Sequence, residues 1–229
     1  GGYAGAGTVS VNIVHNTTEA KILGTTLDLA NSVTLSAIDN TSIYSFAGAL
    51  AIGKKAGLGA AIAVNTVFNT TRAAVEGSDL TISGGFTSDA DESGTIVTLA
   101  VAGAGSEKLA IAGSVALNLF NNKIDSHVIN STIEAGGAVT LTAEDTEISV
   151  ALGGGIAIST GQGAAGAAIG VNLMFNEITA HVESSTITST GASINLDAFA
   201  QQVIMSITFG GAGGDKFALG GSVSANVIM

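Results

Sequence analysis

The chain repeats itself four and a half times. One set of asparagines, Asn12, Asn65, Asn118, Asn172 and Asn226, recurs at intervals of 53, 53, 54 and 54 residues. A second set follows four residues later in each unit, at Asn16, Asn69, Asn122 and Asn176. A fixed period of this length is typical of stacked repeats. We therefore expect residues 1–229 to form a single repeat array, and because both ends cut through a repeat we expect a fragment of a longer chain.

Each repeat contains segments with the two-residue period of a β-strand. In the third unit, Leu109, Ile111, Val115 and Leu117 alternate with Ala110, Ala112, Ser114 and Ala116. Since neither face of this segment is polar, we expect it to be covered on both sides. A second segment, Ala138–Ala143, alternates apolar and polar residues, which predicts Val139, Leu141 and Ala143 inward and the threonines in water.

Short polar tips separate pairs of strands that are rich in glycine and alanine. The tips are Gly53-Lys54-Lys55, Ser106-Glu107-Lys108, Gly161-Gln162-Gly163 and Gly214-Asp215-Lys216. Such sequences favour turns. Two small-residue strands joined by a turn predict a flattened lobe whose walls pack closely.

These features predict an all-β fold, a β-solenoid built from 53–54-residue repeats, with like residues stacked in columns. Two coil counts fit the period: one wide coil per repeat, or three narrow coils of roughly 18 residues each. We favour the wide coil because the Gly/Ala strands occur only once per period. Glu19, Arg72 and Asp125 fall in one column with alternating charge, which direct stacking would reward.

Composition narrows the classes of function. The chain has no cysteine, so it has neither a disulfide nor a thiolate nucleophile. Seven Lys and Arg against eighteen Asp and Glu give a net charge of −11, which repels phosphate backbones and argues against a nucleic-acid partner.

One motif suggests a nucleotide cofactor. Residues 161–166, Gly-Gln-Gly-Ala-Ala-Gly, match the GxGxxG dinucleotide fingerprint. That fingerprint needs a helix after it to bind the pyrophosphate, and here an alternating strand follows. We interpret the segment as a glycine-rich turn and expect no cofactor.

The titratable residues fall into columns as well. His127 and His181 share a position that Lys21 and Ala74 occupy in other units, which we interpret as a solvated face; the alternative is a paired-histidine metal site, for which no third ligand is evident. Asp39, Glu92 and Asp145 also align, and we interpret them as a hydrated turn, with a Ca²⁺ ladder as the alternative. The sequence therefore predicts no catalytic, cofactor-binding or metal-binding residues.

The order of Gly/Ala arm, Val-Asn, second Asn, Ala-x-Val, Ser-x-Ile/Leu and Val-Thr-Leu-x-Ala resembles the repeats of very large bacterial surface exoproteins. These include filamentous-haemagglutinin-like adhesins and leukotoxin-type proteins exported by two-partner or autotransporter routes. The resemblance spans essentially the whole chain and implies a secreted or surface-anchored rod, with no catalytic residues.

The first functional hypothesis is thus a non-enzymatic structural and adhesive segment that attaches to a host surface protein or glycan. One alternative is a membrane-active or oligomerising toxin segment that uses the apolar Gly/Ala arms. A second alternative is a carbohydrate-active β-helix enzyme, although its carboxylates would form an irregular cluster in a groove, about 5 to 10 Å apart. We also expect end-to-end self-association through unpaired strand edges.

Overall fold

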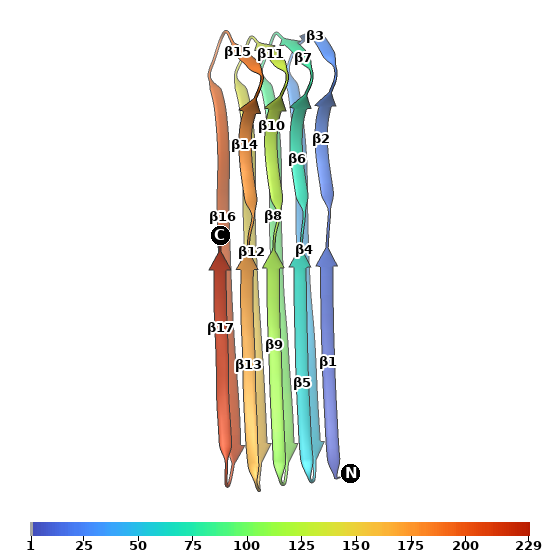
Figure 1. The fold of residues 1–229 in the computed structure, drawn as a ribbon, viewed down its shortest axis with the longest axis vertical. Helices are drawn as coiled ribbons and strands as arrows, with labels where there is room; N and C mark the ends of the chain where they lie inside the picture. Colours follow the sequence, from blue (N-terminus) through green and yellow to red (C-terminus); the bar gives the residue numbers. More distant parts are fainter. Residues whose placement is uncertain (1) are drawn as a thin grey trace.

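The computed structural model describes residues 2–229, which form four parallel β-sheets that stack successive coils of the chain (Figure 1). Sheet 1 consists of β1 (Tyr3–Val14), β5 (Ala56–Val67), β9 (Leu109–Phe120), β13 (Gly163–Met174) and β17 (Ala218–Ile228). Sheet 2 consists of β2 (Thr17–Leu23), β6 (Thr70–Glu76), β10 (Lys123–Ile129) and β14 (Glu177–Glu183). Sheet 3 consists of β3 (Thr26–Ala30), β7 (Asp79–Ile82), β11 (Thr132–Ala135) and β15 (Thr186–Ser189). Sheet 4 consists of the long strands β4 (Val33–Gly53), β8 (Phe86–Ser106), β12 (Val139–Ser159) and β16 (Ile194–Gly214).

The structure confirms the all-β, solenoid-like part of the predicted fold class. Asn12 pairs with Asn65, and Asn118 pairs with both Asn65 and Asn172, so the strand partners are the residues that the sequence repeat aligns. Within residues 2–229 there is no helix long and apolar enough to cross a membrane.

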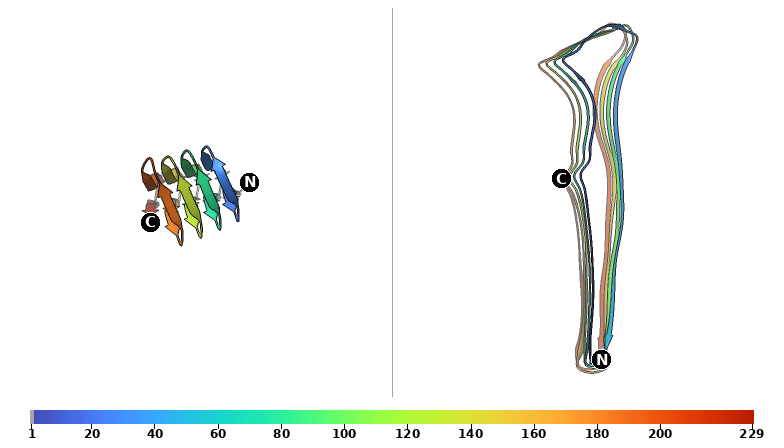
Figure 2. Two further views of the ribbon diagram at one scale, coloured as in Figure 1. Left: turned by 90° about the horizontal axis from the view of Figure 1, so that it is seen from above. Right: turned by 90° about the vertical axis from the view of Figure 1, so that its right-hand side faces the viewer.

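Each coil has a wide end and a narrow end (Figure 2). We call the wide end the head: there, sheets 2 and 3 face the first half of sheet 4. We call the narrow end the lobe: there, sheet 1 faces the second half of sheet 4. The two meet at a waist, where β1 is followed by β2.

The head has a conventional apolar core. Its fully buried side chains come from all three sheets that surround it and include Val75, Leu80, Phe86, Val128, Ile133 and Leu141. Val139, Leu141 and Ala143 point inward as predicted. Burial of such side chains stabilises a fold by roughly 1.5–3 kcal/mol each, so the head holds most of the apolar burial.

The core of the lobe is instead made of alanine, for example Ala63, Ala100, Ala112 and Ala151. The two walls approach so closely that a Cβ atom added to Gly155 would lie 2.1 Å from the carbonyl oxygen of Ala167. The predicted close packing of the walls is confirmed, and the polar tips do form the turns between sheet 4 and sheet 1.

The predicted covering of the lobe strands on both sides is wrong. The large aliphatic side chains of β9, such as Leu109 and Ile111, face outward and are exposed, while Ala110 and Ala112 face inward. The lobe has only two layers, so each sheet has one covered face. Towards the tip only small residues fit on this face, while next to the waist it also holds Ile96, Phe120 and Met174.

A ladder of asparagine amides runs through the end of the lobe that lies next to the waist. The side-chain amide of each asparagine donates to the side-chain oxygen of the next, from Asn12 to Asn65 at 2.7 Å and from Asn118 to Asn172 at 3.0 Å. Sheet 4 uses the remaining hydrogen-bonding capacity; for example, the amide of Asn118 also donates to the carbonyl of Val150. The predicted bonding of amide to amide is therefore confirmed.

The corner between sheets 2 and 3 requires a left-handed backbone in every coil. Gly24, Gly77, Asn130 and Ser184 occupy it with φ values of 55°, 59°, 49° and 48°. Glycine and asparagine adopt this region at little cost, which accounts for three of these four residues.

Candidate functional site

A column of buried carboxyl groups lines the waist. Asp39, Glu92 and Asp145 lie at paired positions of the neighbouring strands β4, β8 and β12, and Glu147 lies two residues beyond Asp145 on the same face. All four side chains are buried. The interpretation of this column as a hydrated turn is wrong, because sheet 4 continues for many residues past it and sheets 1 and 2 cover it.

The second asparagine column supplies the partners of these carboxyl groups. Asn69 donates to Asp39 Oδ1 at 3.1 Å and to Glu92 Oε1 at 2.9 Å, while Asn176 donates to Glu147 Oε2 at 2.7 Å. Each asparagine oxygen accepts the backbone N–H of the asparagine one coil earlier, as in Asn16 N to Asn69 Oδ1 at 3.0 Å. The column is thus an amide–carboxyl network that ties the two sides of the coil together.

Burial alters the protonation of this network. It raises the pKa of Glu92 to about 7, against hydrogen bonds from Thr71 and Asn69 that favour the charged form. Burial and the charge of Asp145 raise the pKa of Glu147 to about 9. At neutral pH Glu147 therefore carries a proton, so the waist holds less negative charge than its four carboxyl groups suggest.

A second titratable cluster lies on sheet 2. His127 on β10 and His181 on β14 are paired residues, with ring centroids 5.2 Å apart, as their shared column predicts. Asp125 lies two residues before His127 on the same strand face, with Oδ2 3.0 Å from His127 Nδ1 and Oδ1 3.4 Å from His181 Nδ1. Asp125 is therefore the third possible metal ligand, which was not evident from the sequence.

The interpretation of the histidine position as a solvated face is wrong for His127. The His127 side chain is only 4% exposed and its Nε2 lies 3.1 Å from Glu76 Oε1, whereas His181 is 39% exposed. Ala74 one coil earlier is also buried. The residue type at this position therefore varies because each coil packs differently there, and not because the position is exposed in every coil.

The carboxylates around His127 shift its protonation. The hydrogen bond with Asp125 raises the pKa of His127; burial opposes this shift, and Glu76 supports it. Burial alone would raise the pKa of Asp125, but the hydrogen bond and the charge of His127, with smaller effects of Thr179 and His181, lower it overall. Arg72 stands nearby, with its Nε 3.6 Å from Asp125 Oδ2 and its Nη1 3.3 Å from Glu19 Oε1, which confirms the stacked charge column.

Comparison with models of protein families, with curated protein sequences and with solved structures finds no match to this chain. Function must therefore be argued from the molecule itself.

The outer faces of the lobe form a further candidate surface. On sheet 4 they carry Tyr44 and Phe46, each 65% exposed, and Leu50 and Ile52, about 70% exposed; on sheet 1 they carry Leu58, Ile62, Leu109, Ile111 and Ile169. We call these two surfaces the apolar outer faces. Exposed apolar area of this extent marks interaction sites in soluble proteins.

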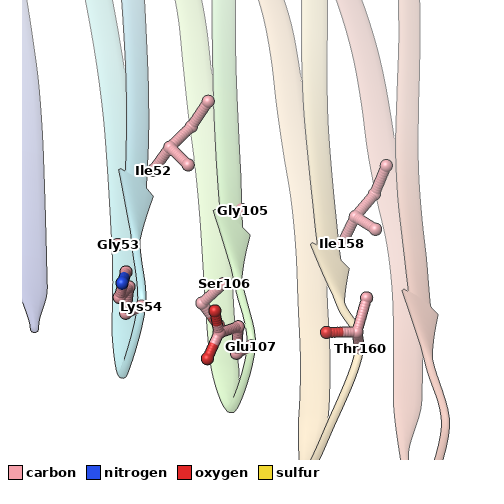
Figure 3. Close-up of a pocket in the computed structure, with 8 residues that line it drawn as sticks. All are labelled: Ile52, Gly53, Lys54, Gly105, Ser106, Glu107, Ile158 and Thr160. Atoms are coloured by element: carbon pink, nitrogen blue, oxygen red, sulfur yellow. The ribbon is translucent and has the colours of Figure 1, made fainter.

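An apolar groove crosses the outer face of sheet 4. On β8, Gly103 and Gly105 lack side chains, while Leu50 and Ile52 rise from β4 and Ile156 and Ile158 from β12. The resulting hollow has a volume of about 480 Å³. Towards the tip it continues between Ile52 and Ile158 to Lys54, Glu107 and Thr160, as Figure 3 shows.

The glycine-rich segment 161–166 lies in the tip before β13 and in that strand itself. A strand follows it, as predicted, so the geometry of a dinucleotide fingerprint is not formed there. His15 is exposed at the waist.

Proposed function

We propose that the chain is a structural and adhesive segment of a secreted or surface-anchored bacterial exoprotein, and that each repeat of 53–54 residues forms one coil of its β-solenoid. The observation that carries this proposal is the pair of apolar outer faces, which recur on successive coils of a rod-like stack. A stack of this kind offers a partner several similar contacts in a row, and linked weak contacts raise the total affinity without any new type of contact.

The groove favours a protein partner over a glycan. Its walls are the aliphatic side chains of Leu50, Ile52, Ile156 and Ile158, and its floor is backbone and small residues. An aliphatic or aromatic side chain of a partner fits such a lining, whereas a glycan would leave most of its hydroxyl groups unpaired there.

Binding to a panel of immobilised extracellular matrix proteins and glycans tests the proposal. The substitutions Phe46→Ser and Ile52→Ser should weaken binding at least tenfold without loss of folding. Leu23→Ser is the matched control, because Leu23 is an apolar residue on the head that is also more than half exposed. Binding that Leu23→Ser weakens as much as Ile52→Ser, or turnover of a glycan, would contradict an adhesive role of the lobe.

A second candidate is a membrane-active or oligomerising segment, which the two-sided apolarity of the lobe favours. Phe46 and Leu58 lie on opposite outer faces and both are exposed, so lipid could contact the lobe on both sides. Dye release from liposomes separates the candidates: release that Phe46→Ser abolishes supports this one, and intact liposomes support adhesion.

The proposal includes self-association end to end. Each sheet has two edge strands, β4 and β16 in the case of sheet 4, and edge strands present unpaired backbone groups. Sedimentation at rising protein concentration should show oligomers. Their loss when Phe46→Ser is introduced would indicate contact through the apolar outer faces instead.

A further inference from the structure

We propose that Asp125, His127 and His181 bind a divalent transition-metal cation of the Zn²⁺ type, which links the neighbouring strands β10 and β14. One ligand atom from each of these residues lies within 4.8 Å of the others. The proposal does not depend on the adhesive role of the lobe, because the site lies on the head.

The spacing of the three groups suits tetrahedral coordination. Zn²⁺ bonds to histidine nitrogen and carboxylate oxygen are about 2.0–2.1 Å long, so neighbouring ligand atoms in a tetrahedral site stand about 3.4 Å apart. The two oxygens of Asp125 divide between the histidines: Oδ2 lies 3.0 Å from His127 Nδ1, and Oδ1 lies 3.4 Å from His181 Nδ1. All three ligand atoms lie within 4.8 Å of one another, so the side chains must draw together by about an ångström to surround one ion, and the fourth position is left to water.

The contact with Glu76 suits His127 to a ligating role. Glu76 Oε1 lies 3.1 Å from His127 Nε2, so in the metal-bound form Nε2–H would donate to Glu76 and leave the lone pair of Nδ1 for the metal. That lone pair then faces the carboxylate oxygen of Asp125 at 3.0 Å. In the metal-free protein a proton on Nδ1 joins these two atoms, and the proposed metal ion takes its place. A carboxylate behind a ligating histidine is also the usual outer partner of a metal site.

The donor set selects the type of metal. Two imidazoles and one carboxylate suit Zn²⁺, Cu²⁺ or Ni²⁺, whereas Ca²⁺ and Mg²⁺ prefer all-oxygen sites. The half-exposed ring of His181 gives the ion a path from solvent, while the burial of Asp125 and His127 reduces competition from water.

The charges around the site set its strength. Arg72 lies near Asp125 and opposes a second cation, and Lys21 pairs with Glu19 at 2.6 Å. Against these, Glu76, Asp125 and Glu19 carry negative charge, so with neutral histidines the surroundings have a small negative balance. We therefore expect binding weaker than at closed four-ligand zinc sites, and removal of Arg72 should tighten it.

The experiment measures binding of ZnCl₂ to the intact chain by calorimetry, and of CoCl₂ by visible absorption, with MgCl₂ and CaCl₂ as comparison salts. One equivalent of Zn²⁺ should bind, Co²⁺ should give the intense absorption of a tetrahedral site, and the comparison salts should give neither. The substitution His181→Ala should weaken Zn²⁺ binding at least tenfold, and Arg72→Gln should strengthen it several-fold.

The control is His15→Ala, which removes the exposed histidine at the waist and should leave the affinity unchanged. Circular dichroism shows whether each variant folds, and His181→Ala is chosen because that side chain is half exposed. The absence of one-to-one binding would overturn the proposal. So would binding that His181→Ala and Asp125→Asn leave intact, or that His15→Ala abolishes.

Discussion

The head and the lobe use the same alternation of side chains with opposite results. In the head the large residues, such as Phe86 and Leu141, face inward and the small polar ones face water. In the lobe the alanines face inward and the large residues, such as Phe46 and Ile52, face water. The side of a strand that becomes the core is therefore decided by the distance between the walls and not by hydrophobicity alone.

Glycine contacts show how narrow the lobe is. A Cβ atom added to Gly166 would lie 2.0 Å from the carbonyl oxygen of Gly211 across the core. With the walls in backbone contact, the lobe gains stability from dispersion contacts and hydrogen-bonded ladders, whereas the head gains it from burial of large apolar groups.

The largest expected effect compares one phenylalanine in each region. Phe86→Ala should lower the free energy of unfolding by about 3–5 kcal/mol, because it empties a fully buried site in the head. Phe46→Ala in the lobe should change it by less than about 0.5 kcal/mol. Denaturant unfolding measures both, and equal losses would show that Phe46 is covered in solution.

The reverse comparison adds volume to the lobe. Gly166→Val should destabilise by about 1–3 kcal/mol, since its new side chain meets the opposite backbone and not a flexible side chain. Gly113→Val on the outer side of β9 is the matched control, because a Cβ there has no atom within 4 Å. Thermal unfolding should separate the two variants; similar melting temperatures would mean that the walls can part.

The polar waist between the two regions should make stability depend on pH. The folded-state pKa of Glu147 is about 9, against an ordinary value of 4.5, so at intermediate pH the folded chain holds a proton that unfolding releases. Stability should therefore fall as pH rises from about 4.5 to about 9, by up to about 1.4 kcal/mol per pH unit for this proton.

The substitution Glu147→Gln isolates that contribution, because glutamine has the shape of the protonated acid. The melting temperature of the variant should fall less between pH 5 and pH 9 than that of the natural chain, because glutamine has no proton to lose in this range. A parallel pH dependence in both proteins would assign the effect to other groups, such as Glu92.

The smallest effect is expected at the tip of the lobe. Gln162 is exposed in the turn before β13, and Gln162→Ala should change the free energy of unfolding by less than about 0.5 kcal/mol. A loss of unfolding free energy as large as that of Gly166→Val would show that the tip contributes as much to the stability of the lobe as the packed walls do.

Much of this fold could be predicted from the repeat. The spacing of Asn12 and Asn65 predicted their stacking, and the polar tips predicted the turns, because both are local or periodic features. The inward face of β9 could not be predicted, because alternation defines two faces without saying which one meets the opposite wall. That depends on the second wall, which lies far away in sequence.

The candidate metal centre was missed for a related reason. The column of His127 and His181 was visible in the sequence, but its variability suggested exposure. The spacing of two residues between Asp125 and His127 was the available signal, since such residues share a strand face. The role of Glu76, which comes from the preceding coil, required the structure.

The asparagine ladder gives the stack a sense of direction. Every bond of the ladder points the same way, from Asn12 towards Asn226, so a coil placed before Asn12 meets an oxygen and a coil placed after Asn226 meets an N–H. A coil added upside down would set like groups against each other. The molecule thus resembles one column of a polar crystal, in which each layer dictates the orientation of the next and aligned dipoles strengthen one another as the column lengthens.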